Sequence, residues 1–248
     1  MPEKAIGPEF MRLTKYDYAG PTAQEKGEPQ PPLEIPYNPQ SRLVDLPDPL
    51  TAGAQTLDLP AILQQRRSHR KYAAQPISLA ELSFLLWATQ GVKKVTSRPV
   101  TLRTVPSAGA RHAFETLLLI NKVDGVEPAL YRYAAIEHAL LRLEAPADIN
   151  QQITHACLDQ NQVLTSAVTF IWVAVVDRMR YRYGQRGYRY LHLDAGHVCQ
   201  NLYLAAEVIG CGVCAIAAFN DDELNRVLSL DGDEQFAIYL GSLGRQPD

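Results

Sequence analysis

The sequence predicts an α+β fold, in which helices and strands share a core without alternating regularly. Residues 168–176 form a continuous apolar run rich in β-branched and aromatic side chains, which is typical of a strand buried on both faces. Residues 190–209 carry small and apolar side chains almost all round a helical wheel, which indicates a long central helix. After residue 57, other segments have the apolar spacing of a helix or the alternation of a strand. They do not follow the regular strand–helix–strand order of a doubly wound sheet.

Length and composition narrow the class of protein. The chain has 248 residues, of which 46% are hydrophobic and 21% charged, with a formal net charge of -3 and four cysteines. This size suits one large domain or two small ones, with a core that needs no disulfides. No apolar run of about 18 residues and no secretory signal is visible, and the charge balance supplies no field for nucleic acid. We therefore expect a cytoplasmic protein that binds neither nucleic acid nor a membrane.

The first 57 residues differ in composition from the rest. We expect residues 1–57 to form a proline-rich N-terminal arm and residues 58–248 to form the globular domain. Eight prolines between residues 21 and 49 leave the arm no room for a helix or a central strand. Two interpretations stay open: a solvated tail, or an extended arm laid over the fold or over a partner subunit. The side chains that could anchor such an arm are Tyr16, Tyr18, Leu33, Ile35 and Tyr37.

Local signals place the helix ends after residue 57. Asp58 can cap a helix at 59–65, and Ser78 with Glu81 forms a capping box for a helix that Gly91 ends. The remaining expected elements are, in chain order, a strand at 116–120, a hairpin of 129–133 and 138–143, a helix at 147–158, a short apolar stretch at 213–218, a helix capped by Asp221 or Asp222 that ends at Leu228, and a last strand at 235–240.

Cys211 and Cys214 have the spacing of a thioredoxin-like pair, but they follow a helix instead of opening one. Buried structural cysteines are therefore favoured over a redox pair or a metal site, and we expect no metal. The sequence also contains no P-loop, nucleophile-elbow or metalloprotease motif.

Three segments carry candidate ligand-binding residues. Residues 66–71 read Arg-Arg-Ser-His-Arg-Lys, a dense set of donors that suits an anionic ligand such as phosphate, or else a solvated basic helix end. Residues 104–112 are rich in small side chains. This composition either lets the backbone approach a flat ligand closely or belongs to an ordinary loop. Residues 179–190 alternate Arg with Tyr, a pattern that fits ligand contact, a subunit interface or nucleic acid.

Taken together, these segments resemble the FMN-dependent nitroreductase superfamily, and within it the SagB-type dehydrogenase branch. The resemblance rests on five stretches that occur in the family's order: 66–72, 82–91, 106–112, 183–190, and 193–197 with 200–202. It spans roughly residues 58–246. It implies a nitroreductase-like fold, with a central, mostly antiparallel sheet flanked by helices, in an interlocked homodimer that binds FMN at the subunit interface.

The resemblance also implies roles for individual residues. Those that would hold the FMN phosphate, ribityl chain and pyrimidine edge are Arg66, Arg67, Ser68 and Arg70. Those that would approach the isoalloxazine from the partner chain are Pro106, Ser107, Ala108 and Gly109. The other expected contacts are Gln160 at the polar edge of the flavin, Ala217 and Ala218 near N5, and Arg245 as a second phosphate partner.

The activity implied by the resemblance is hydride transfer through flavin N5, from NAD(P)H as transient donor to a small nitroaromatic or quinone-like acceptor. Azoline-oxidising relatives carry Lys-Tyr where this chain has Arg182-Tyr183, and a protonated arginine cannot act as the base that a lysine can be. Oxidation of an azoline or another peptide or natural-product substrate is therefore an alternative, with Tyr183 as the candidate catalytic residue. A non-catalytic flavin-binding subunit or sensor is the alternative from another class.

Overall fold

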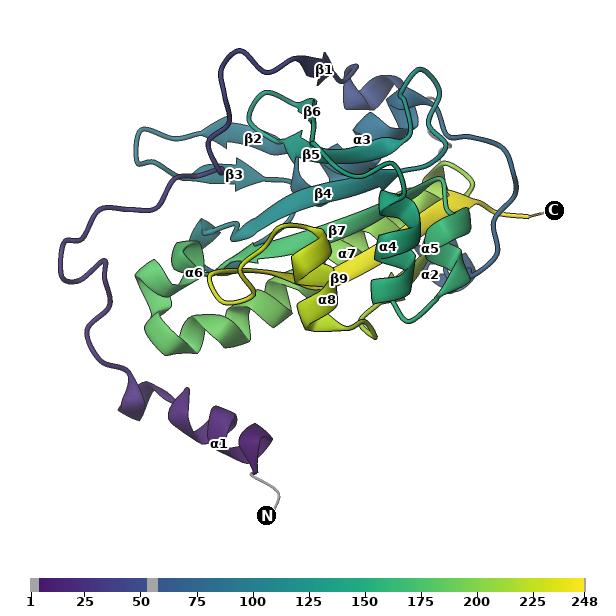
Figure 1. The fold of residues 1–248 in the computed structure, drawn as a ribbon. Coiled ribbons are helices and arrows are strands. Elements are labelled where there is room, and N and C mark those ends of the chain that lie inside the picture. The colour runs from purple at the N-terminus through teal and green to yellow at the C-terminus, as the bar shows by residue number, and fades with distance from the viewer. Residues whose placement is uncertain (1–4, 53–57, 248) are drawn as a thin grey trace.

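A seven-stranded sheet, antiparallel throughout, forms the centre of the protein (Figure 1). The structure is a computed structural model that describes residues 5–52 and 58–247. The strands run in the order β1-β6-β5-β4-β7-β9-β8. Their bounds are β1 Leu43–Asp45, β4 Phe114–Ile120, β5 Ala129–Ala134, β6 Ala139–Arg142, β7 Val168–Val175, β8 Cys211–Ile216 and β9 Gln235–Arg245, and a separate hairpin pairs β2 Val92–Val95 with β3 Thr101–Arg103. Helices packed on this sheet confirm the predicted α+β class.

Helices cover both faces of the sheet (Figure 1). Their bounds are α1 Ile6–Leu13, α2 Leu59–Gln65, α3 Leu79–Gln90, α4 Ile149–Ala156, α5 Asn161–Thr165, α6 Val176–Tyr183, α7 Gly187–Val208 and α8 Asp221–Val227. Helices α3 and α7 share one hydrophobic core with the sheet, and α4, α5 and α8 share the other. Strand β7 serves both cores, because Phe170 and Trp172 enter the first while Ile171 and Val173 enter the second. The prediction of a strand buried on both faces is therefore confirmed.

The predicted N-caps of α2 and α3 are confirmed. Asp58 accepts a hydrogen bond from Ala61 N at 2.8 Å, and Ser78 and Glu81 form both bonds of the capping box. Helix α8 departs from the prediction by one residue, because Asn220 is its cap and accepts from Glu223 N at 3.1 Å. Residues 221 and 222 lie instead in the first turn, where their negative charges favour the helix dipole.

The last strand runs five residues past its predicted end at Leu240. The extension reads Gly-Ser-Leu-Gly-Arg, a composition more typical of a turn than of a strand. A Cβ on Gly241 would lie 2.9 Å from Leu202 Cδ2, and a Cβ on Gly244 would lie 2.8 Å from Tyr72 Cγ. These glycines are therefore present because other side chains pack directly against the strand backbone.

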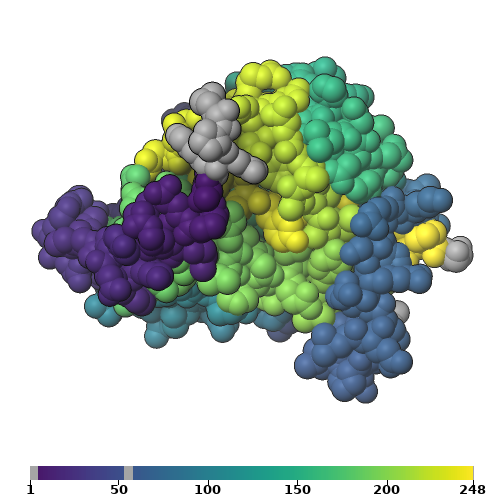
Figure 2. Space-filling view, turned by 90° about the horizontal axis from the view of Figure 1, so that it is seen from below, coloured from purple at the N-terminus to yellow at the C-terminus, as the bar shows by residue number. Residues whose placement is uncertain are grey.

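The N-terminal arm contains a helix, contrary to the prediction that proline leaves no room for one. Pro8 occupies the first turn of α1, where its missing N–H is tolerated, and the prolines of the arm resume only at Pro21. Beyond α1 the arm lies over the fold: Gln24 N donates to Tyr181 O at 2.9 Å, and β1 pairs with β6. In Figure 2 the purple arm rests against the green segment that contains α6 and the start of α7.

None of the helices among the described residues combines the length and the apolar character required to cross a bilayer.

Candidate functional site

The basic segment 66–71 forms a strap along the outer edge of β8. Ser68 makes a parallel bridge to Val213, and His69 N donates to Val213 O at 2.9 Å. Gly212 allows this close approach, since a Cβ there would lie 2.5 Å from His69 Cγ. The strap is secured at its end by Tyr72, whose hydroxyl lies 2.8 Å from Ser242 Oγ. In Figure 2 the blue segment that includes α2 and the strap stands out from the body on the side away from the arm.

The strap presents cations that no carboxylate of the described residues neutralises. Among the described residues, Arg66, Arg67 and Arg70 form no ion pair, and Arg67 and Arg70 are exposed. The Arg66 guanidinium lies over the Tyr203 ring at 5.3 Å, and Ser68 Oγ lies 3.0 Å from the Tyr203 hydroxyl. Unpaired guanidinium groups beside a serine hydroxyl make a donor set that suits a phosphate.

Gln160 and the residues after β8 form a second polar group. Gln160 Nε2 donates to Ala218 O at 2.7 Å and to Cys157 O at 2.9 Å, and its Oε1 accepts from Gln162 Nε2 at 2.9 Å. Ala217 and Ala218 are both exposed just beyond the end of β8. The structure thus brings together Gln160, which the resemblance placed at the polar edge of a flavin, and Ala218, which it placed near N5.

The loop 106–109 is organised by Asp194 of α7. Ser107 Oγ donates to Asp194 Oδ2 at 2.6 Å, and Ala108 N lies 3.2 Å from both carboxylate oxygens. Burial raises the pKa of Asp194, while the hydrogen bonds from Ser107 and Ala108 act in the opposite direction. Within the chain, the Ser107 hydroxyl and the Ala108 N–H therefore hold the loop against α7 through their hydrogen bonds to Asp194.

The strap and the loop 106–109 do not meet within one chain. Their contacts on α7 are Tyr203 and Asp194, which are nine residues apart, or roughly 13 Å along the helix and half a turn round it. Within the chain, the strap and the loop therefore contact opposite sides of α7.

Tyr183 lies at the C-terminal end of α6, against the loop 106–109. A Cβ on Gly109 would lie 2.5 Å from the Tyr183 hydroxyl, and Gly109 adopts the left-handed conformation with φ 57°. The Tyr183 ring meets Tyr190 edge-on with centroids 4.7 Å apart. A hollow of about 690 Å³ is lined by Tyr183 and Arg186 together with residues of the arm, including Tyr16, whose ring centroid lies 4.2 Å from the Arg186 guanidinium. Tyr183 is thus accessible from a hollow that the arm helps to line.

Arg245 is engaged within the chain. Its Nη2 lies 2.7 Å from Glu81 Oε2, and its Nη1 donates to Ile209 O at 2.8 Å. Since Glu81 also belongs to the capping box of α3, Arg245 ties the end of β9 to the start of that helix. Its predicted role as a phosphate partner stays a prediction.

Sequence reasoning assigned no role to Asp194 or Tyr203, which hold the loop and the strap. A carboxylate on the largely apolar helix α7 was a usable signal for Asp194, because a 4% exposed acid needs hydrogen-bond donors. Tyr203 carried no such signal, since an aromatic residue is expected on an apolar helix. Within the described ranges, no group of three or more potential metal ligands is present.

Comparison with known families decides the kind of protein. The sequence model of the nitroreductase family matches residues 63–245, a range that contains both the strap and the loop. The chain belongs to the nitroreductase family. Members of this family are FMN-dependent oxidoreductases, and the unpaired cations of the strap fit the phosphate of that cofactor.

Relatives extend the nitroreductase assignment over most of the chain. The protein named Putative nitroreductase MJ1384, from Methanocaldococcus jannaschii, is 32% identical over 203 residues, which are 82% of this chain and 96% of that protein. A crystal structure described as that of a putative nitroreductase from Anabaena variabilis superposes with a TM-score of 0.68 at 28% identity, covering 84% of this chain and 42% of the other. Trifolitoxin-processing protein TfxB of Rhizobium leguminosarum bv. trifolii is 28% identical over 133 residues, 52% of this chain and 36% of TfxB. The chain spans less than half of these last two proteins.

Proposed function

We propose that this nitroreductase passes hydride through FMN from NAD(P)H to a small nitroaromatic or quinone-like acceptor. The observation that carries the proposal is the strap, which presents three arginines at the edge of a nitroreductase-family sheet; none of the three has a carboxylate partner in the part of the chain that the structure describes. FMN supplies the redox chemistry when bound, accepting and returning hydride at N5. The protein then has to bind the cofactor, orient it and exclude water.

The residues of the strap divide these tasks. Arg66 is oriented by its stacking on Tyr203, and Ser68 by its hydrogen bond to the same side chain, so both donors are held in place before an anion binds. Arg67 and Arg70 add exposed positive charge beside them. Gln160, with its amide fixed on Ala218, would keep the segment after β8 in position beside the flavin.

We further propose a homodimer in which Pro106, Ser107, Ala108 and Gly109 of one chain approach the cofactor held by the strap of the other. Helix α2 exposes Leu59 and Leu63 and buries only Ile62, which is unfavourable unless another surface covers the helix. An apolar groove of about 410 Å³ lies beside it between α3 and α7. A second copy of the chain would cover both and bring the loop to the strap.

Oxidation of a peptide-derived azoline is the second candidate function. Its support is the similarity to TfxB, which is named as a processing protein, and the hollow beside Tyr183. Arg182 counts against it, since arginine does not give up its proton in proteins. Oxidation of an azoline by this chain would have to use Tyr183 for proton transfer, so Tyr183→Phe should abolish that activity while leaving flavin reduction by NAD(P)H intact.

The strap assignment is tested by a double substitution, Arg66→Ala with Arg70→Ala. Each arginine lost removes a charge-assisted interaction of about 1.5–3 kcal/mol, so FMN affinity should fall at least a hundredfold and the protein should purify colourless. The flavin-to-protein absorbance ratio measures this, and Arg226→Ala, which removes an exposed charge on α8, serves as the control. Full flavin occupancy in the double variant would show that the strap does not hold the cofactor.

A further inference from the structure

The hollow of about 690 Å³ lies between arm residues 16–25 and the end of α6 with the turn that follows it, and it is open to solvent. Both ends of this arm segment are fixed to the domain. The Tyr16 hydroxyl lies 3.2 Å from that of Tyr190, and Gln24 N donates to Tyr181 O at 2.9 Å. The volume falls within the range of small-molecule sites, roughly 300–1,000 Å³, so the hollow has room for a ligand of one or two rings.

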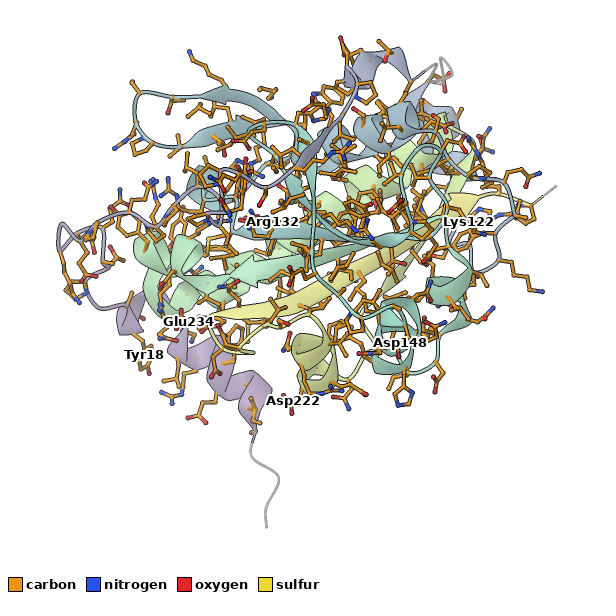
Figure 3. All side chains as sticks on the ribbon, turned by 45° about the horizontal axis from the view of Figure 1, so that its top comes forward. Tyr18, Lys122, Arg132, Asp148, Asp222 and Glu234 are labelled. Carbon is orange, nitrogen blue, oxygen red and sulfur yellow. The ribbon has the colours of Figure 1, made fainter. Side chains whose placement is uncertain are left out.

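Tyrosine rings line the hollow from both sides. Tyr16 belongs to the arm and Tyr183 to α6, and Tyr16 is 69% exposed. Figure 3 labels Tyr18, two residues further along the arm, on the side of the molecule where α6 lies. An exposed tyrosine ring offers a flat apolar face to an aromatic ligand. The residues that continue the arm wall lack long side chains: Ala19, Gly20 and Pro21.

Two arginines line the same hollow without a carboxylate partner. Neither Arg182 nor Arg186 forms an ion pair within the described ranges. Arg186 is held in place, because its Nη1 donates to Thr14 O at 2.7 Å. Arg182 is exposed, and its guanidinium lies over the Tyr183 ring at 5.8 Å. The Arg182 guanidinium is therefore available to an anionic group on a ligand in the hollow.

Glu25 is the carboxylate among the described residues that line the hollow, and it is engaged by the arm itself. Thr22 donates to its Oε2 from N at 2.8 Å and from Oγ1 at 3.0 Å, and these bonds lower the pKa of Glu25. The lining thus carries two positive charges against one negative charge. A further cation stands close by, since burial and then the charge of Arg182 lower the pKa of Arg111.

We propose that this hollow selects the acceptor, and that it favours an aromatic ring bearing a carboxylate, which Arg182 binds. The inference rests on the proposed function, in which the loop 106–109 approaches the flavin. The hollow adjoins that loop, because a Cβ on Gly109 would lie 2.5 Å from the Tyr183 hydroxyl and 2.9 Å from Arg182 Cδ. The tyrosines contact the ring and Arg182 the carboxylate, so a neutral ring of equal size loses the second interaction.

Calorimetric titration of the oxidised, full-length protein with para-nitrobenzoate and with para-nitrobenzamide tests the proposal. The two ligands share ring and shape but differ in charge. We expect para-nitrobenzoate to bind about tenfold more tightly at low ionic strength, and most of this preference to vanish at about 1 M sodium chloride. Equal affinities of the wild-type protein for the two ligands at low ionic strength would overturn the proposal.

Three variants locate the binding group. Arg182→Gln should bring the affinity for para-nitrobenzoate down to that for para-nitrobenzamide, and Arg182→Lys should keep most of the preference, since it keeps the charge. Arg226→Gln, which removes an exposed charge on α8, should leave the preference unchanged. A preference that survives Arg182→Gln would overturn the assignment to the hollow.

The titration involves neither a hydride donor nor turnover, so it separates this inference from the proposed function. Equal affinities in a protein whose flavin NAD(P)H bleaches would overturn the ligand preference alone. A clear preference in a protein whose flavin neither nucleotide bleaches would support the hollow as a site for aromatic carboxylates and contradict NAD(P)H-dependent turnover.

Discussion

His112 follows the loop 106–109 and is the residue whose ionisation the fold opposes most clearly. It is 5% exposed, and burial, with smaller contributions from Arg103 and Arg111, lowers its pKa from 6.5 to about 3. The unfolded chain therefore takes up a proton below about pH 6.5 while the folded chain does not, so stability falls as the pH drops from there towards 3.

Replacing His112 removes this dependence. A shift of one pKa unit corresponds to ~1.4 kcal/mol. Protonation of His112 in the unfolded chain should therefore lower the unfolding free energy of the wild-type protein by up to about 3 kcal/mol by about pH 4. His112→Asn keeps a residue that tolerates the positive φ of 42° and should flatten the acid limb of urea unfolding by that amount. An unchanged pH dependence would mean that His112 is protonated in the folded protein.

At the same scale, the candidate site divides into residues that could be predicted and residues that could not. Arg66, Ser68 and Arg70 stand together in the sequence, so their clustering needed no knowledge of the fold. Asp194 lies 87 residues from Ser107, and Tyr203 lies 135 residues from Ser68. Only the packing of α7 against both segments brings these partners together, and single-sequence reasoning has no access to such contacts.

At the scale of secondary-structure elements, two ion pairs of similar length test whether the arm contributes to stability. One pair is buried and contacts the arm, and the other is exposed. Glu115 of β4 pairs with Arg178 of α6 at 2.5 Å with both side chains 4% exposed, whereas Glu127 and Arg142 pair at 2.6 Å in solvent. Glu115 also accepts from Ile35 N of the arm at 2.9 Å. Glu115→Ala should therefore cost about 3–5 kcal/mol of unfolding free energy, and Glu127→Ala at most about 1.

Equilibrium denaturation of the two variants measures the difference. Similar losses would show that the buried pair contributes no more than a surface pair, and would remove the basis for treating the arm as part of the core. Limited proteolysis should also cut the arm faster in Glu115→Ala, because the backbone of Ile35 loses its partner.

Elements defined by local chemistry were predictable, and those defined by distant packing were not. The capping box of α3 and the turn of the β5–β6 hairpin lie within a few residues of sequence. The end of β9 depends on Leu202 and Tyr72 packing over Gly241 and Gly244, which no local pattern reveals. The prediction missed helix α1 because it extended the effect of the prolines at residues 21–49 to residues 6–13, which they do not disrupt.

At the scale of the whole molecule, the proposed flavin site between the strap of one chain and the loop of another predicts a dimer. A 27.6 kDa chain that completes its site with a second copy should sediment as a dimer of about 55 kDa. Leu63→Glu places a charge on the exposed face of α2 without disturbing a buried residue, since Leu63 is 53% exposed. This variant should shift the protein towards monomer in analytical ultracentrifugation and weaken FMN binding in parallel. A wild-type monomer that retains flavin would contradict the shared site.

The central claim is that the chain is an FMN oxidoreductase reduced by a nicotinamide nucleotide. Its most direct test is the visible absorption spectrum of the purified protein, recorded before and after anaerobic addition of NADPH and then NADH. We predict a flavin spectrum that one of the two nucleotides bleaches and that a quinone or nitroaromatic acceptor restores. A flavin that neither nucleotide bleaches would contradict NAD(P)H-dependent turnover and favour substrate-driven dehydrogenation or a non-catalytic flavoprotein. A colourless protein that does not bind added FMN would contradict the account as a whole.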